Sequence, residues 1–137
     1  MQASALAGIA ISQTRTALAH AISYPLTARF GLPHGIACSF TLPALLAFNA
    51  AIDDGRLEAL ARSLGYAEVR DLAAGLADLL VRLRMRERLA AHLPHRNEII
   101  ALSGEMFAPG RAENNLRKAS EEDVRAIVSE ALDALRL

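Results

Sequence analysis

Apolar residues spaced three and four positions apart dominate two long segments of this chain. Between residues 72 and 83 they are Leu72, Leu76, Leu79, Leu80 and Leu83. Near the C-terminal end the same spacing is followed by Val124, Ile127, Val128, Ala131, Leu132 and Leu135. This period is that of a helix with one buried face. Before the second segment, Ser120 and Asp123 have the spacing of a capping box, which predicts that a helix begins there.

The composition extends this helical expectation to the whole chain. Of the 137 residues, 53% are hydrophobic but only 4% are aromatic. Alanine and leucine therefore supply the apolar content, rather than the β-branched and aromatic residues that fill sheets. A chain of this length can bury roughly two thirds of the surface that its unfolded form exposes. We expect an all-α fold, a single multi-helix bundle of about six to eight helices over residues 1–137.

Prolines and glycines predict where individual helices begin and end. Residues 3–22 carry small and aliphatic side chains on all sides, which is typical of a helix surrounded by protein. After Pro25 a short helical stretch should be capped at its C-terminal end by Gly31. The next helix is expected at residues 34–51, with a kink at Pro43. Further helices are predicted at residues 56–64, 84–93 and 96–107, followed by a loop at 108–115.

Charge and cysteine content exclude several classes of partner. Fifteen basic residues balance fifteen acidic ones, so no net field attracts nucleic acid or anionic lipid. The single cysteine, Cys38, excludes an internal disulfide and fits a cytoplasmic location. The apolar residues 3–11 lack a basic leader and are followed by polar residues, so we expect neither a signal peptide nor a membrane span. A start inside an apolar helix suggests that further sequence precedes residue 1.

Two of the four histidines lie in apolar helical segments. His20 and His34 are fourteen residues apart, and the proline- and glycine-containing segment 24–33 between them can reverse the chain, so that their imidazoles converge. Neutral imidazole is a common ligand of iron and zinc. A histidine on an apolar helix is nevertheless more often a hydrogen-bonded core residue, and a metal site needs about four protein ligands, or three with an open position. The residues alone leave both interpretations open.

Other residues that could carry chemistry have simpler interpretations. His92 and His95 flank a proline that breaks the helix needed to align them, so we interpret both as solvated. Asp53 and Asp54 lie at a helix start, where a capping role explains them. Cys38 has no C-x-x-C partner and is interpreted as a small core residue. The chain has no glycine-rich phosphate loop and no G-x-S-x-G motif, so it does not bind nucleotide phosphates through its own glycines.

A longer pattern resembles a known family. Residues 7–43, AGIAISQTRTALAHAISYPLTARFGLPHGIACSFTLP, resemble the start of the helical C-terminal domain of iron-containing (group III) alcohol dehydrogenases, which have a dehydroquinate synthase-like fold. In that family a helix with a metal-binding histidine leads through an HP or YP turn to a PHG motif, whose histidine also binds the metal. Residues 113–128, ENNLRKASEEDVRAIV, are similar to the asparagine-rich turn and acidic helix start near the end of the family's domain.

The resemblance implies a site and a reaction. His20 and His34 would bind Fe(II), with Zn as an alternative, and Tyr24 would lie near the catalytic centre, where many members have a histidine. The metal would polarise the oxygen of an alcohol or aldehyde while hydride passes to or from NAD or NADP. The YPLT and GLPHG segments are most similar to a branch of the family linked with phosphonate metabolism, which implies phosphonoacetaldehyde as a candidate substrate.

The resemblance also implies that the site is incomplete within these residues. The family's other two ligands, an aspartate and a histidine, lie upstream of the matched region, as does its nucleotide-binding domain. Residues 1–137 would then be a single helical metal-binding domain from the C-terminal part of a longer enzyme. The alternative hypothesis is a catalytically inactive, stand-alone helical module for interaction or scaffolding. In either case the missing N-terminal half or self-association is expected to cover the exposed interface.

Overall fold

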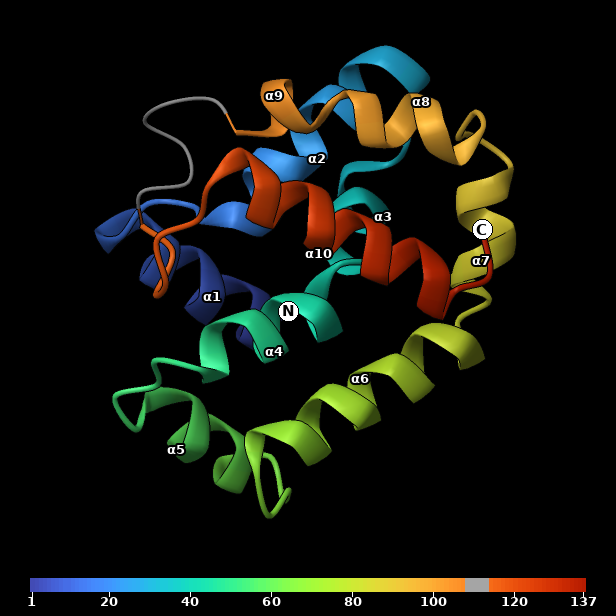
Figure 1. Cartoon of the computed structure of the whole chain (residues 1–137). Coiled ribbons are helices and arrows are strands. Elements are labelled where there is room, and N and C mark those ends of the chain that lie inside the picture. Colours follow the sequence, from blue (N-terminus) through green and yellow to red (C-terminus); the bar gives the residue numbers. More distant parts are fainter. Residues whose placement is uncertain (108–113) are drawn as a thin grey trace.

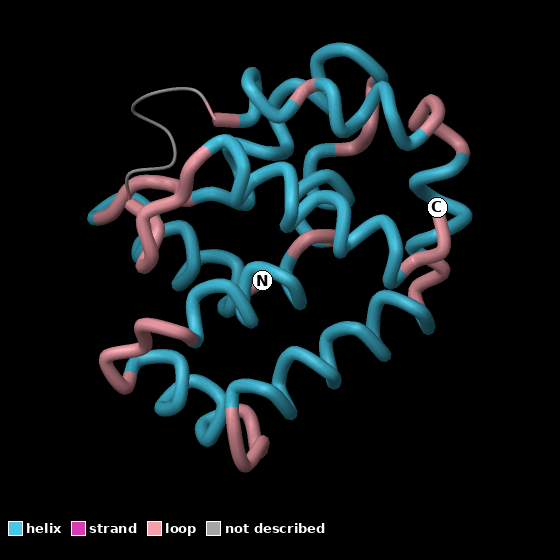
Figure 2. The backbone as a smooth tube through the Cα atoms, in the orientation of Figure 1, coloured by secondary structure: helices cyan, strands magenta, loops and turns pink. Residues whose placement is uncertain are grey.

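The computed structural model describes residues 1–107 and 114–137, and throughout these residues the regular structure is helical, with no strand (Figures 1 and 2). The ten helices of the described residues are α1 (Gln2–Gln13), α2 (Leu18–Phe30), α3 (His34–Ser39), α4 (Leu42–Ala50), α5 (Arg56–Ser63), α6 (Val69–Arg82), α7 (Met85–Ala90), α8 (Arg96–Ala101), α9 (Ser103–Met106) and α10 (Glu121–Ala134). The all-α expectation is confirmed. The loop expected at 108–115 falls mostly outside the described residues.

Helices are more numerous than expected because short ones replace predicted long ones. The helix predicted at residues 34–51 is divided into α3 and α4, with Pro43 in the first turn of α4, where its missing N–H is harmless. Arg84 adopts a left-handed conformation with φ of 55° and separates α6 from α7. Leu102, with φ of −82°, lies between α8 and α9.

The N-terminal segment departs from the prediction in two ways. The helix expected over residues 3–22 stops at Gln13, and α2 begins at Leu18 and runs through Pro25 without ending. Pro25 is buried, so packing overrides the local cost of a proline in a helix. The prediction that the first helix is surrounded by protein is wrong for α1, which has no buried residue. Leu6 and Ile9 are 67% and 62% exposed because no helix of the described chain packs over them.

The core is built around α2 and α10, and α10 crosses the middle of the view in Figure 1 with α6 below it. Leu18, Ile22 and Leu26 line the buried face of α2 at spacings of four. They belong to the same buried cluster as Val124, Val128 and Leu132 of α10. A smaller cluster of Ala61, Val69 and Leu72 joins α5 to α6. No helix of the described residues is both long enough and apolar enough to cross a membrane.

The predicted glycine cap at the end of α2 is confirmed. Gly31 has φ of 63°, a left-handed conformation that suits glycine. Its N–H donates to the carbonyl of Thr27 at 3.1 Å, which closes the last turn of the helix. The chain then reverses, and Leu32, which is fully buried, anchors the connection before α3 starts at His34. This turn brings the start of α3 back against α2.

The predicted capping box at the start of α10 is also confirmed. The Ser120 hydroxyl accepts from the Asp123 N–H at 3.1 Å, and the Asp123 carboxylate accepts from the Ser120 N–H at 2.8 Å. The Ser120 N–H, and then the Ser120 hydroxyl, which donates to the same carboxylate at 2.9 Å, hold the pKa of Asp123 below its ordinary value. The ionised carboxylate is therefore the form that stabilises this helix start.

This capping box gives a pH-dependent prediction. Asp123→Asn should lower the free energy of unfolding at pH 7 by about 0.3–1 kcal/mol, because a charge at the N-terminal turn is lost. Since the folded-state pKa is depressed, the contribution of Asp123 is complete above the unfolded pKa of about 4 and is lost as the pH falls through the folded value. Urea unfolding at pH 7 and pH 3 measures the difference, which should shrink at pH 3.

The matched control is Asp78→Asn, which removes an exposed carboxylate in the body of α6. It should leave the stability at pH 7 nearly unchanged. An effect of Asp123→Asn that is equal at both pH values would contradict the assigned role of the carboxylate.

Candidate metal centre

Helices α2 and α3 bring the two histidines singled out in the sequence to one point. His20 lies in the first turn of α2, and His34 is the first residue of α3. Their ring centroids are 5.2 Å apart, with the rings edge to face at 60°. His20 is half-buried and His34 is exposed. The reversal at Gly31 thus places both imidazoles where one small ligand can contact them.

Tyr24 lies on the same side of α2 as His20, one turn further along. The buried face of α2 is formed by Leu18, Ile22 and Leu26, so residues 20 and 24 point to the opposite side of the helix. The Tyr24 ring stacks on that of His34, with centroids 6.0 Å apart and planes inclined by 23°. The three residues therefore form one aromatic cluster at the surface.

Cys38 joins this cluster from α3. It follows His34 by one turn, and its Sγ lies 3.6 Å from Nε2 and 3.9 Å from Nδ1 of that histidine. The potential ligand atoms of His20, His34 and Cys38 all lie within 4.8 Å of one another. Cys38 is half-buried and outside the buried core, so its interpretation as a core residue is corrected. The spacing of four residues from His34 was the signal that could have placed it here.

Ser23 orients the His34 ring. Its buried hydroxyl donates to the backbone carbonyl of His20 at 2.8 Å, and its oxygen lies 3.3 Å from Nδ1 of His34. With its proton on the carbonyl, the Ser23 oxygen can accept from Nδ1–H in the His34 tautomer that carries its proton there. In that tautomer Nε2 is unprotonated, with its lone pair available to a metal ion. No sequence motif predicts the role of this serine, because that role depends on how α2 and α3 pack.

The protonation states of the cluster are set by burial and by neighbouring charge. Burial, and then the positive charge of His34, lower the pKa of His20, which favours its neutral imidazole. Burial raises the pKa of the Cys38 thiol, and a hydrogen bond with the Ser23 side chain lowers it in part. Without a metal ion, the cluster therefore presents a neutral His20 and a protonated thiol at neutral pH. Neutral imidazole is the form that binds metals.

The two imidazoles fit a divalent transition-metal ion, since imidazole nitrogen suits zinc and iron. The Cys38 sulfur is nearly equidistant from Nε2 and Nδ1 of His34, at 3.6 and 3.9 Å, so it lies beside the ring and not along the direction in which Nε2 would bind an ion. His34 is exposed, so further ligands can approach the site from outside the chain.

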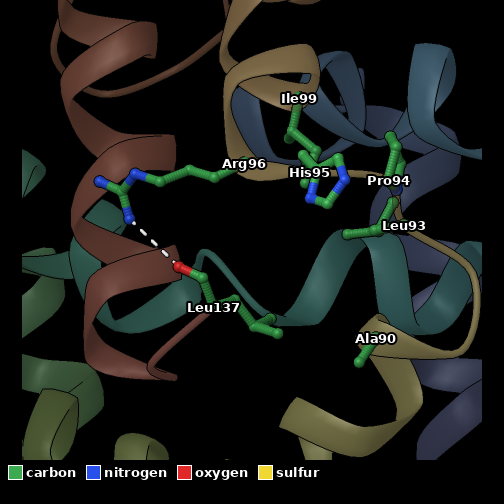
Figure 3. Close-up of a pocket in the computed structure, with 7 residues that line it drawn as sticks. All are labelled: Ala90, Leu93, Pro94, His95, Arg96, Ile99 and Leu137. Atoms are coloured by element: carbon green, nitrogen blue, oxygen red, sulfur yellow. Dashed lines mark hydrogen bonds between the residues drawn. The ribbon is translucent and has the colours of Figure 1, made fainter.

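The other histidines lie outside this cluster and are exposed, as expected. His95 lines a surface hollow of about 550 Å³ between α7, α8 and the C-terminal end (Figure 3). The adjacent Arg96 donates to the Leu137 carbonyl at 3.4 Å and to Asp133 at 2.6 Å, which ties α8 to α10. We assign this hollow a structural role, because its charged side chain, that of Arg96, is hydrogen-bonded to other residues of the protein.

The capping role expected for Asp53 is confirmed. Its two carboxylate oxygens accept from the backbone N–H groups of Leu57 and Glu58 at 2.9 and 3.1 Å. These bonds, led by the one from Leu57, hold the pKa of Asp53 below its ordinary value. Asp54 instead pairs with Arg56. Both carboxylates therefore act within the loop and helix to which they belong.

Comparison with known proteins indicates the family of this chain. Residues 1–132 match the family model described as "Fe-containing alcohol dehydrogenase family, C-terminal". A phosphonoacetaldehyde reductase of Streptomyces viridochromogenes is 32% identical over 90% of this chain and 33% of its own length. A 1-propanol dehydrogenase of Salmonella typhimurium is 34% identical over 95% of this chain and 39% of its own length. A sulfoacetaldehyde reductase of Bilophila wadsworthia is 31% identical over 98% of this chain and 38% of its own length.

The chain thus spans between a third and two fifths of the length of these three relatives. The family match covers nearly all of its residues, including both histidines of the cluster and most of the capped helix α10. The chain belongs to the Fe-containing alcohol dehydrogenase family and corresponds to its C-terminal, helical region.

Proposed function

We propose that this chain is the metal-binding, C-terminal domain of a longer NAD(P)-linked alcohol dehydrogenase or aldehyde reductase. His20 and His34 are the two ligands that it contributes, with Fe(II) as the expected ion and Zn as the alternative. The observation that carries the proposal is the 5.2 Å approach of the two imidazoles from α2 and α3, in a chain of this family. An aspartate and a histidine from the upstream part of the enzyme complete the ligand set.

The side chains of the cluster have distinct roles in this proposal. When bound, the metal ion supplies a Lewis acid that polarises the substrate oxygen. His20 and His34 present neutral nitrogen donors, and Ser23 holds the His34 ring so that Nε2 is unprotonated. Tyr24 stacks on His34 at the exposed edge of the cluster, where its hydroxyl can hydrogen-bond substrate or water.

The dinucleotide must bind mainly to the rest of the enzyme. The described residues form no strand, and the chain has no glycine-rich phosphate loop. The exposed apolar side chains of α1, Leu6 and Ile9 among them, are then covered by the upstream part of the enzyme or by a second copy of the chain. The alternative, an inactive scaffold module, needs the same surface covered but gives no reason for the convergence of His20 and His34.

The substrate class in this proposal is a small aldehyde or alcohol. The relatives are named for phosphonoacetaldehyde, sulfoacetaldehyde and 1-propanol. Two of these three carry an anionic group on the carbon next to the aldehyde carbon. We take phosphonoacetaldehyde as the first substrate to test, because the YPLT and GLPHG segments around His20 and His34 are similar to that branch.

The histidine pair gives the first test of this function. In the full-length enzyme, His20→Ala or His34→Ala should each lower bound metal and reductase turnover by more than about 100-fold, because each removes a donor that no neighbouring group replaces. Metal analysis by mass spectrometry and NAD(P)H oxidation with phosphonoacetaldehyde measure the two effects. His92→Ala removes an exposed histidine outside the cluster and should leave both unchanged. Full turnover of either cluster variant would refute the proposed ligand role.

Ser23 gives a second test that separates ring orientation from ligation. Ser23→Ala should weaken Zn²⁺ binding to the full-length enzyme by about 10- to 100-fold, because His34 loses the hydrogen bond that fixes its tautomer. Competition titration with a chromophoric chelator measures the affinity. Ser39→Ala is the matched control, since Ser39 also donates to a helix carbonyl, that of Gly35, at 2.6 Å. Equal affinities for the two variants would show that Ser23 does not position the ring.

A further inference from the structure

A surface groove runs between the C-terminal ends of α6 and α10, which lie close together beside α7 (Figure 1). It consists of two adjoining hollows of about 120 and 400 Å³, which share Val81, Ala134 and Leu135 in their linings. None of the residues that line these hollows belongs to the candidate metal centre. The groove is therefore a separate feature of the surface.

The centre of the groove is apolar. Its floor includes the buried side chains of Phe40, Leu80 and Leu135. Val81 stands above this floor and is 66% exposed, and Ala134 is exposed on the opposite side. Apolar side chains that remain exposed beside a groove are typical of a surface that contacts another protein.

The charged side chains along the groove are separated by sign. Asp78 and Glu130 line the hollow at one end, and Arg86 and Arg136 line the hollow at the other. All four are exposed, and none of them takes part in an ion pair within the described part of the chain. The remaining charged residue of the lining, Glu87, already has an arginine partner at 3.8 Å. The groove thus has an acidic end and a basic end.

A groove with this charge pattern is complementary to a second copy of itself. In a two-fold symmetric dimer, both chains use the same surface patch. If the axis crosses the groove at right angles near Val81, the acidic end of each copy faces the basic end of the other. Asp78 then faces Arg86 of the second copy. Glu130 likewise faces Arg136 of the second copy. An axis parallel to the groove would bring like charges together, so the charges favour the first orientation.

We propose that this groove is the docking site for a second copy of the chain, in a two-fold dimer with Val81 of both copies at its centre. The apolar centre supplies most of the attraction. The charges at the two ends fix the orientation, because exposed ion pairs contribute little energy individually. The upstream part of the enzyme would need a matching pattern of its own, whereas a second copy already carries it. The proposal does not depend on the metal centre, so either can fail without the other.

Disulfide cross-linking of the full-length enzyme tests this arrangement directly. Val81→Cys places two thiols at the dimer axis, where their Cβ atoms can approach to the roughly 3.8 Å that a disulfide needs. Oxidation with copper phenanthroline should give a covalent dimer, and peptide mass spectrometry should find residue 81 joined to residue 81. The matched control is Leu60→Cys, at a position on α5 that is 45% exposed and outside the groove. It should not cross-link, and absence of the 81–81 peptide would overturn the proposal.

Analytical ultracentrifugation of the full-length enzyme tests the affinity. Val81→Glu brings two like charges together at the axis, so the dissociation constant of the dimer should rise by more than about tenfold. The measured mass should halve near the dissociation constant of the variant, and Leu60→Glu should leave it unchanged. Bound metal should be equal in all three proteins, which shows that the variants fold. An unmodified enzyme that is monomeric, or an unchanged mass for folded Val81→Glu, would contradict the proposed dimer.

Reversal of the end charges tests the orientation. Glu130→Arg and Arg136→Glu should each weaken the dimer, because each places like charges opposite one another. The double variant exchanges the two charges and should recover the affinity of the unmodified enzyme. A double variant no tighter than the weaker single variant would exclude the antiparallel arrangement of the two grooves.

Discussion

Burial of one face of α2 is the constraint on which the candidate site depends. Leu18, Ile22 and Leu26 are fully buried and join α10 in the main core. With that face fixed, the helical period directs His20 and Tyr24 outward on the opposite side. The glycine cap and the reversal after α2 then return His34 to the same point. The hydrophobic core thus determines the geometry of a polar cluster that contributes little to it.

The hydrophobic core sets the approximate positions of α2 and α3, and the polar contacts between these helices fix the orientation of individual side chains. Ser23 is buried on α2 and reaches both the His20 carbonyl and the His34 ring. It links the backbone of one proposed ligand to the side chain of the other. Such outer contacts decide which nitrogen of an imidazole is free to bind a metal. A shift of α3 along α2 would therefore change the tautomer of His34 as well as its position.

The features that sequence predicts well here are local. The capping box of Ser120 and Asp123 and the glycine cap at Gly31 depend on residues within one helical turn, and the structure contains both. The all-α architecture follows from composition and period. By contrast, the break before Leu18 and the passage of α2 through Pro25 depend on tertiary packing, which no short window of sequence reveals.

In the candidate site, too, some features can be predicted from local sequence and others depend on tertiary packing. Spacing alone leaves His20 and His34 open between a core role and a metal role, and the family resemblance favours the metal role. The sequence pattern places Cys38 in the core, although its spacing from His34 is visible, because the start of α3 at His34 is needed to align the two side chains. Ser23 has no sequence signal at all. Its role arises only where two helices meet.

Anomalous X-ray diffraction from crystals of the Zn²⁺-loaded full-length enzyme would locate the metal ion that His20 and His34 are proposed to share. We expect an anomalous peak at the zinc edge within about 2.0–2.1 Å of one nitrogen from each of the two imidazoles. A fully occupied zinc site elsewhere, with no peak between His20 and His34, would contradict that proposal.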